Sequence, residues 1–171
     1  MSFNSVVMEH FRAICILCRS QMAIGSAFAL FRPLVDAIIR GEWLYLCATP
    51  EQMESFMKRD FNLGSLGFPA MAKAVDNKTG LEGYMARFND FYREMSDYTH
   101  TGHDAVVHRL AKDGGIEPTY PERKIRRLVT QAARITLLHF VVVSRAMGDA
   151  ASESRLCEVF GFLDDGSVEE T

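Results

Sequence analysis

An arginine and a histidine, Arg93 and His100, stand seven positions apart in the segment FYREMSDYTHTGH. This spacing is close to two turns of an α-helix, so both side chains leave such a helix in nearly the same direction. Arginine presents a planar set of donors to phosphate, and histidine accepts and releases protons near neutral pH. The pair therefore predicts an anion site beside a proton-transfer group. This chemistry suits phosphodiester cleavage by the 2′-hydroxyl of RNA, which needs no metal ion.

The helix that carries the pair is expected to end just before His100, where Gly102 permits a turn. At such an end the long Arg93 side chain can reach the imidazole, with Asn89 and Asp97 flanking both residues. A structural interpretation stays open beside this one. In it, Arg93 pairs with Asp97 one turn further on, and His100 stabilises the helix end.

Arg32, Asp36 and Arg40 recur every four residues in an otherwise apolar helical segment. We expect Asp36 to orient an arginine or the histidine, and Arg32 to face phosphate. Both should then approach Arg93 and His100 in the folded chain. The alternative is a ladder of ion pairs within one helix, worth roughly a few tenths of a kcal/mol per pair.

A later helical segment opens with several cations, in the run ERKIRRL. Positive charge at a helix N-terminus opposes the helix dipole, and a bound phosphate or an acidic partner would offset that repulsion. A solvated basic face, tempered by Glu117 and Glu122, is the alternative interpretation. The predicted RNA-binding side chains are Arg123, Lys124, Arg126, Arg127 and His103.

Histidines and acids that lie close in the sequence also suggest a metal cluster, whose ligands would be His100, His103, His108, Asp97 and Asp104. The chain has no Glu-x-x-His motif, which di-iron bundles require in pairs. Cys15 and Cys18 form a CxxC without a second ligand pair or a βαβ setting, so we expect small core residues there. His139, in the apolar run LLHFVVV, is expected to be a core histidine with satisfied hydrogen bonds. We therefore predict no metal and no cofactor.

Helical periodicity covers nearly the whole chain, and no segment alternates as a strand does. Apolar residues make up 48% of the 171 residues, enough for a real core. The predicted fold is all-α: an up-and-down helical bundle of about four long helices with short additional helices. One domain is expected over 1–163, followed by an acidic, flexible tail over 164–171. The predicted helical segments are 3–20, 22–48 (kinked or restarted at Pro33), 51–59, 70–75, 81–99, 103–112, 122–147 and 152–163.

The formal net charge is −3, so nucleic-acid binding requires a local patch. No apolar run approaches the roughly 20 residues of a membrane-spanning helix. Glu9, His10 and Arg12 interrupt the N-terminal region too early for a secretory signal. We therefore expect no membrane contact and a cytoplasmic location.

The Arg93–His100 pair resembles the Arg-x4-6-His signature of the HEPN superfamily, a set of helical bundles. In that family the arginine lies late in a bundle helix and the histidine at its end. The segment 31–56 is similar to bacterial HEPN-like families, and so is the Tyr-x-His-x-Gly element over 98–102. The resemblance spans residues 25–145 and adds Tyr98 to the residues expected around the pair.

This resemblance implies a metal-independent endoribonuclease that leaves a 2′,3′-cyclic phosphate and a 5′-hydroxyl. It implies a homodimer whose two Arg–His pairs form one composite site, with Arg93 and His100 as the catalytic residues. Many such proteins are toxins or phage-defence effectors, so an antitoxin is an expected partner. Glu94 departs from the family's pattern, in which asparagine often follows the arginine. Gly102 departs from the subgroup silenced by a nucleotidyltransferase, which has a tyrosine at that position.

Two other classes stay open. Some HEPN proteins are not nucleases, and the chain would then be a dimeric module that binds a nucleotide, RNA or another protein. The second class is an unrelated helical metal-binding bundle.

Overall fold

The computed structural model describes residues 2–21, 23–60, 66–81, 83, 85–110, 114–115 and 119–165. Within these ranges the chain is helical and forms no strand, which confirms the predicted all-α bundle. The elements are α1 (Ser2–Ser20), α2 (Ile24–Leu46), α3 (Pro50–Met57), α4 (Phe68–Thr79), the 3-10 helix η2 (Met85–Phe88), α5 (Asn89–Thr99), α6 (His103–Val107), α7 (Glu122–Ala146) and α8 (Ala150–Asp165).

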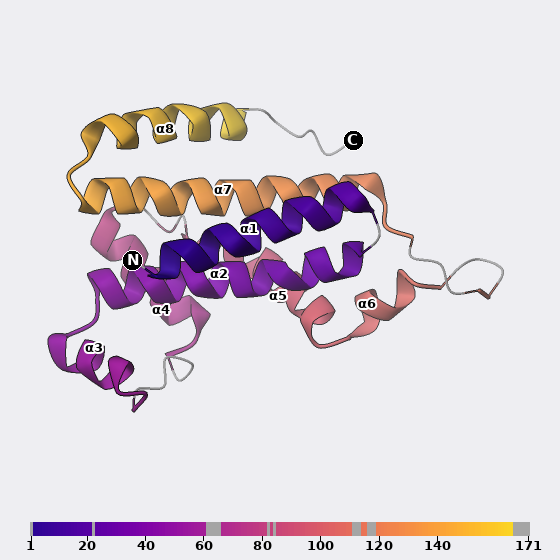
Figure 1. Ribbon diagram of the computed structural model, residues 1–171, viewed down its shortest axis with the longest axis horizontal. Helices are drawn as coiled ribbons and strands as arrows, with labels where there is room; N and C mark the ends of the chain where they lie inside the picture. Colours follow the sequence, from indigo (N-terminus) through magenta and orange to yellow (C-terminus); the bar gives the residue numbers. More distant parts are fainter. Residues whose placement is uncertain are drawn as a thin grey trace.

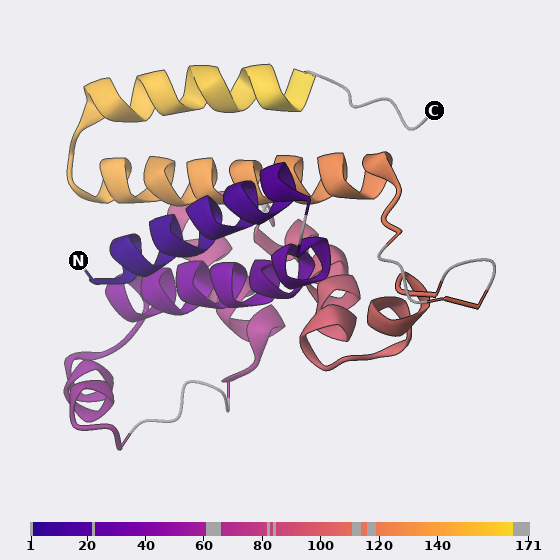
Figure 2. The ribbon, with the colours of Figure 1, turned by 45° about the vertical axis from the view of Figure 1, so that its right-hand side comes forward.

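Helix α2 is the centre of the bundle. It contacts α1, α4, α5 and α7, whereas α8 packs on α7. Figures 1 and 2 show α7 and α8 as an antiparallel outer pair, with α1 between α7 and α2. Helices α3 and α6 lie toward opposite ends of the molecule (Figure 1). Side chains of α2 therefore meet residues that are distant in the sequence.

The sequence of α2 explains its central place. Its buried apolar residues are Ile24, Ala27, Phe28, Phe31, Leu34, Val35, Ala37, Ile38, Ile39, Trp43 and Leu44. A helix that is apolar on so many sides is stable only when neighbouring helices cover it. Phe31 illustrates the packing: its ring meets the ring of Phe91 in α5 edge to face, with 4.6 Å between centroids.

A buried carboxylate determines where the segment before α5 becomes helical. Asp76 of α4 accepts hydrogen bonds from the backbone amides of Met85 at 2.9 Å and Ala86 at 3.2 Å. These amides open η2 and would otherwise lack partners inside the protein. Helix α4 ends just beyond Asp76, at Gly80, whose φ of 71° suits glycine.

Two predicted helices have different bounds because of these contacts. The segment predicted to end at 75 continues to Thr79, since Gly80 supplies the stop signal. Of the described residues in the segment predicted as one helix over 81–99, those from Met85 onward are helical, first as η2 and then as α5. Positions 82 and 84 within it lie outside the described residues.

Three further expectations need correction. Helix α2 runs through Pro33, which excludes the restart, one of the two alternatives predicted there. The helix predicted over 103–112 ends at Val107. Helix α8 extends to Asp165, so the first two residues of the predicted tail are helical, and the remaining tail lies outside the described residues.

A buried polar group interrupts the core near the C-terminal end of α2. Glu42 and His139 of α7 are only 3% and 2% exposed. His139 Nδ1 lies 2.9 Å from Glu42 Oε1, and its Nε2 lies 3.2 Å from Asn4 Oδ1. His139 is thus a core histidine with both ring nitrogens engaged, as predicted.

Glu42→Gln should remove a pH dependence of stability. Burial raises the pKa of Glu42 above its ordinary value, although His139 acts in the opposite direction. The folded chain therefore keeps a proton that the unfolded chain releases, and the wild-type free energy of unfolding falls as pH rises above about 4.5. Glutamine can still accept from His139 and carries no such proton. The variant should gain stability relative to wild type as pH increases.

Urea unfolding at a series of pH values measures this difference. Glu9→Gln, an exposed substitution of the same kind on α1, is the control and should follow wild type. A constant difference between Glu42→Gln and wild type across the series would contradict the expectation.

Candidate functional site

The end of α5 is tied to α2 by a hydrogen bond that Pro33 makes available. Proline has no N–H, so the carbonyl of Ala29, one turn earlier, lacks its usual helical partner. The Thr99 hydroxyl donates to this carbonyl at 3.2 Å. His100 follows directly and caps α5, with its amide bonded to the Ser96 carbonyl. The proline in α2 thereby helps to place His100 beside that helix.

Thr99→Val should cost about 1 kcal/mol in the free energy of unfolding, because the Ala29 carbonyl then loses its donor. In a Pro33→Ala background the new amide can bond to that carbonyl, and the same substitution should cost about half as much or less. A double-mutant cycle by urea unfolding measures the coupling. Thr79→Val is the matched control, since its hydroxyl bonds to the Val75 carbonyl, away from Pro33. Equal costs for Thr99→Val in both backgrounds would refute the link.

His100 contacts an arginine of α2, Arg32. Arg32 Nη1 lies 2.6 Å from His100 Nε2. Arg32 Nε donates to Tyr92 Oη at 3.1 Å, and Tyr92 Oη donates to Asp36 Oδ1 at 3.0 Å. Asp36 Oδ2 also lies 3.7 Å from Arg40 Nη2. These five residues, from two helices, form one connected set that we call the Arg32 network.

The hydrogen bonds of the Arg32 network have defined directions. Arginine has only donors, so its contact with His100 requires an unprotonated Nε2, and the imidazole is then neutral. Burial, followed by the charge of Asp36, raises the pKa of Tyr92, so its hydroxyl keeps the proton that it shares with Asp36. The guanidinium is held through Nε, and its other N–H groups beyond the His100 contact have no partner among the described residues. The network therefore offers a proton acceptor and anion-binding donors side by side.

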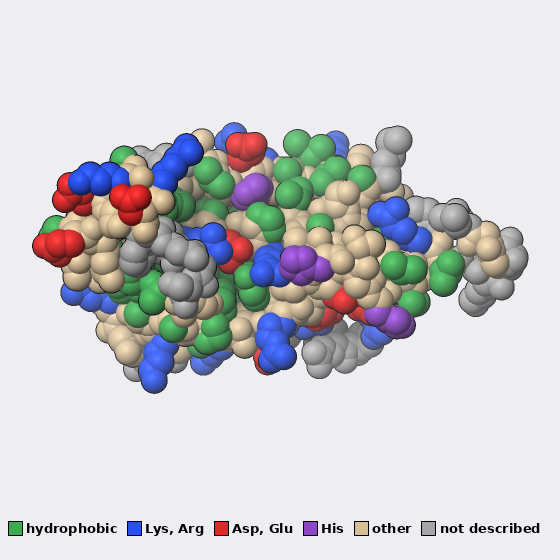
Figure 3. Space-filling view, turned by 90° about the horizontal axis from the view of Figure 1, so that it is seen from below, with side chains coloured by type: hydrophobic (Ala, Val, Ile, Leu, Met, Phe, Trp, Pro, Cys, Tyr) green, Lys and Arg blue, Asp and Glu red, His purple; other side chains and the backbone are tan. Residues whose placement is uncertain are grey.

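An open hollow of about 340 Å³ lies along this part of α2. Its lining residues are Phe3, Arg32, Pro33, Asp36, Ala37, Arg40 and Thr99. Two arginines and one carboxylate make the lining positive overall, which favours an anion such as phosphate. Figure 3 shows a face of the molecule where a histidine lies beside a Lys or Arg side chain, and where cations are scattered instead of forming one patch.

Arg93 does not pair with His100, contrary to the sequence-based expectation. It is exposed on α5 and makes no hydrogen bond or ion pair with any described residue, Asp97 included. Helix α5 stays regular to Thr99, so two turns of about 5.4 Å each still separate the two side chains. His100 is engaged by Arg32 instead. The expectation that Arg32 approaches the histidine agrees with the geometry, whereas the partner assigned to His100 was wrong.

Asp97 contacts the backbone of the turn that follows α5. Its Oδ2 accepts a hydrogen bond from the Asp104 amide at 2.6 Å, near the start of α6. A Cβ at Gly102 would overlap the Asp97 carboxylate, so glycine is required there for space. The left-handed backbone of this turn occurs at Thr101, with φ 54°. Asp97 therefore shapes the turn after His100 and is not bonded to it.

Tyr98 and Asn89 also lie apart from the Arg32 network. Tyr98 is buried and stacks on Phe28 of α2, with 4.7 Å between ring centroids. Burial, followed by Asp104, raises the pKa of this tyrosine. Asn89 is the first residue of α5 and makes no hydrogen bond to the network. Both had been expected beside the Arg–His pair.

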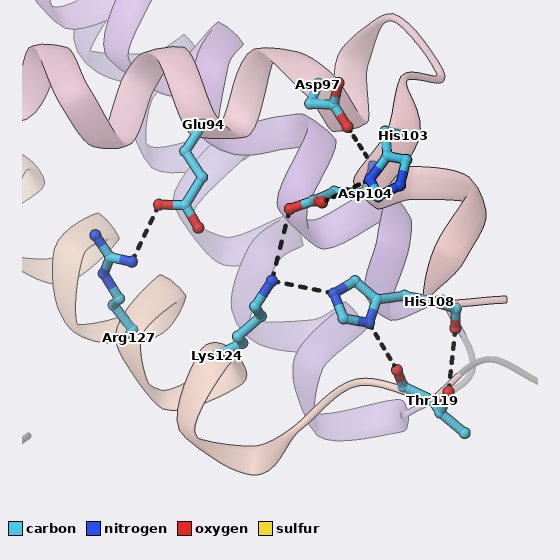
Figure 4. A network of polar contacts seen from close by, with 8 residues as sticks. All are labelled: Glu94, Asp97, His103, Asp104, His108, Thr119, Lys124 and Arg127. Atoms are coloured by element: carbon cyan, nitrogen blue, oxygen red, sulfur yellow. Dashed lines mark hydrogen bonds and ion pairs between the residues drawn. The ribbon is translucent and has the colours of Figure 1, made fainter. Parts of the chain in front are cut away.

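Carboxylates neutralise much of the predicted RNA-binding run. Arg127 pairs with Glu94 of α5 at 3.0 Å, and Arg126 pairs with Glu122 at 2.7 Å. Figure 4 shows Glu94 directed toward Arg127. The acid that follows Arg93 in the sequence is therefore committed to α7. It does not face the Arg32 network.

Of the other predicted RNA-binding residues, Lys124 and His103 also lie beside a carboxylate. Lys124 Nζ lies 3.6 Å from Asp104 Oδ2 and 3.1 Å from His108 Nε2, as Figure 4 shows. His103 is highly exposed and lies 3.4 Å from Asp104 Oδ1. Arg123 is exposed and has no ion-pair partner among the described residues. A strong phosphate-binding patch is therefore not favoured at the start of α7.

The histidines and acids proposed as a metal cluster are instead engaged in the hydrogen bonds and ion pairs described above. Among the residues that the structure describes, no three His, Cys, Asp or Glu side chains gather as a metal site requires. Burial raises the pKa of Cys15 and raises that of Cys18 to about 11, so both remain thiols. Both were expected to be core residues, but they are only half-buried, and of the two Cys18 packs against the core. Of the helices in the described ranges, none is long and apolar enough to cross a membrane.

Sequence reasoning did not identify Tyr92 and Thr99 as site residues. Tyr92 falls on the apolar side of the helical wheel, and nothing in its spacing reveals a hydroxyl bonded to both Arg32 and Asp36. For Thr99, the sequence did contain a signal that could have identified it, namely Pro33 in α2. A proline inside a helix leaves one carbonyl without its usual partner, and a hydroxyl from a neighbouring helix is a suitable donor.

The fold and the site define an all-α bundle with an arginine–imidazole network across two helices, beside a polar hollow. The chain belongs to a family of unknown function (DUF6988), whose model matches residues 4–160. That match extends from α1 into α8 and so includes the whole Arg32 network. No curated protein matches the chain, and no solved structure does either.

Proposed function

We propose that this protein is a metal-independent endoribonuclease in which Arg32 and His100 act on one phosphodiester. The observation that carries the proposal is the 2.6 Å contact between Arg32 Nη1 and His100 Nε2. It joins anion-binding donors to a proton acceptor, beside a hollow with a positive lining. The resemblance to HEPN ribonucleases supports the same reaction class, with Arg93 as the motif arginine.

In this mechanism neutral His100 accepts the proton of the 2′-hydroxyl at Nε2, and the 2′-oxygen attacks the adjacent phosphorus. The incoming phosphate draws Arg32 Nη donors from the imidazole to its own oxygens, where negative charge develops. The bond to the 5′-oxygen breaks, and that oxygen takes a proton from the imidazolium. The products are a 2′,3′-cyclic phosphate and a 5′-hydroxyl. Tyr92 and Asp36 position Arg32 through its Nε.

The proposal includes a homodimer. Arg93 and His100 are both exposed on α5, and Arg93 has no partner within the described part of one chain. A second copy could place its Arg93 near the phosphate bound at the first copy's Arg32, giving the composite site that the HEPN resemblance implies. From the same resemblance we propose that the protein is cytoplasmic, acts as a toxin or phage-defence effector, and has an antitoxin as its protein partner.

Arg32→Lys tests the role of the guanidinium. Lysine keeps the charge but cannot hold Tyr92 and a phosphate at the same time, so the cleavage rate should fall about 10- to 100-fold, as expected for one lost charge-assisted hydrogen bond. Cleavage of a labelled single-stranded RNA under saturating conditions measures the rate. Arg19→Lys, an exposed substitution on α1, is the control. A rate for Arg32→Lys equal to that of the control would exclude the proposed role.

The non-catalytic module is the second candidate, and one observation favours it. In the folded chain Arg32 occupies His100 Nε2, so the site is closed until a ligand displaces that contact. A module that binds the RNA backbone would use the same donors without the proton transfer. RNA binding by wild type that weakens in Arg32→Lys, with no cleavage, would identify this second function.

A further inference from the structure

A second cavity lies against the C-terminal end of α2. Its volume is about 220 Å³. Most of its wall is apolar, contributed by Phe3, Leu44, Leu46, Met53, Phe56, Val142 and Val143. Tyr45 and Met57 also line it and are 52% and 74% exposed, so the cavity reaches the surface between α2 and α3. An apolar molecule can therefore enter it from solvent.

The polar part of this cavity is the buried group of Glu42, His139 and Asn4, all of which line it. His139 engages Glu42 Oε1. Glu42 Oε2 is buried and has no hydrogen-bond partner among the described residues. A buried polar atom without a partner is costly. Once the pH is above the raised pKa of Glu42 and its proton is released, Oε2 is an acceptor, and a ligand that brings a donor satisfies it. The apolar wall therefore favours a ligand with an apolar body, and Glu42 favours a ligand with a hydrogen-bond donor.

The charges around Glu42 favour a positively charged donor. The C-terminal ends of α2 and α7, at Leu46 and Ala146, both line the cavity, and carbonyl groups at helix ends attract cations. Figure 1 shows these two ends at the same side of the bundle. Asp76 adds to the negative surroundings of Glu42, whereas His139 and the N-terminus of α1 act in the opposite sense. Lys78 acts on Cys47 at the end of α2, and Arg145 lies in the last turn of α7, so the carboxyl of Glu42 itself is the main group that favours a cationic donor.

We propose that this cavity binds a small primary amine with an apolar tail, whose ammonium group donates to Glu42 Oε2. A cavity of 150 Å³ is known to hold benzene, so this one has room for about nine non-hydrogen atoms. The class is therefore short alkyl or arylalkyl amines. This binding site is separate from the Arg32 network and does not depend on the ribonuclease proposal.

Isothermal titration calorimetry with 2-phenylethylamine tests the site. The comparison ligand is 2-phenylethanol, which has the same size and carries no charge. The amine should bind one molecule per chain, about tenfold or more tightly than the alcohol. Glu42→Gln should weaken amine binding about tenfold or more and change alcohol binding by less than about threefold. Glu122→Gln, which removes an exposed carboxylate of α7, should leave both affinities at the wild-type level.

A second variant covers the case in which Glu42→Gln does not fold. Ala146→Trp adds a large side chain at an exposed lining position and should abolish binding of both probes. The proposal is overturned if millimolar amine gives no saturable binding to wild type, or if amine and alcohol bind equally well. Amine binding that survives both Glu42→Gln and Ala146→Trp would overturn it as well.

Discussion

Replacing His100 by alanine should lower the rate of RNA cleavage by about 10²–10⁴-fold, the usual contribution of one positioned proton-transfer group. The variant keeps Arg32, its bonds to Tyr92 and the hollow, so RNA should still bind. The loss should therefore appear in the rate at saturating RNA and leave the dissociation constant within about threefold of wild type. Single-turnover cleavage and an RNA-binding titration measure the two quantities separately.

His10→Ala is the matched control for this substitution. His10 lies on α1 and makes no hydrogen bond with any described residue. Its replacement should leave the cleavage rate at the wild-type level. Unfolding curves for both variants exclude a loss of folded protein. A His100→Ala rate indistinguishable from wild type would remove histidine from the mechanism.

Phe31→Ala should lower the free energy of unfolding by about 3–5 kcal/mol, the range for an aromatic residue removed from a well-packed core. Phe31 has no exposed surface, and its ring packs edge to face on Phe91. The change opens a cavity at the α2–α5 contact, next to Arg32. A loss of this size is a large part of the stability of a typical domain. Urea unfolding measures it.

Ile16→Ala provides the comparison, because Ile16 lies on α1 with 65% of its surface exposed. This variant should stay within about 0.5 kcal/mol of wild type. If Phe31→Ala cost less than about 1 kcal/mol, the surrounding side chains would have to collapse into the space. Such a result would contradict the tight α2–α5 packing that places Tyr92 and His100 on Arg32.

The helical class and the long helices were predictable, because their apolar spacing extends over many turns and is insensitive to a few misplaced residues. The bounds near 68–99 were harder to predict. They depend on Asp76, whose side chain accepts from Met85 and Ala86 about ten positions later. Helical periodicity carries no information about such a contact. The uninterrupted α2 has a similar origin, since Thr99 compensates for the bond lost at Pro33.

The candidate site was predicted only in part, because some of its contacts depend on the packing of helices and not on local spacing. Residue types and local spacing identified His100, Arg32 and Asp36 as candidates, and the fold brings all three into one network. Local spacing also suggested that Arg93 meets His100, but a regular helix keeps residues two turns apart from touching. Which arginine contacts the histidine is decided by the packing of α5 on α2. A single sequence does not encode that contact locally.

Cleavage of a single-stranded RNA in excess EDTA, measured beside a 2′-deoxy strand of the same sequence, tests the proposed chemistry most directly. The nucleophile belongs to the RNA and Arg32 stabilises the developing charge, so the RNA should be cut without a metal and the deoxy strand should remain intact. The products should carry a 2′,3′-cyclic phosphate and a 5′-hydroxyl. Cleavage that requires a divalent metal, or that also cuts the deoxy strand, would contradict the Arg32–His100 mechanism.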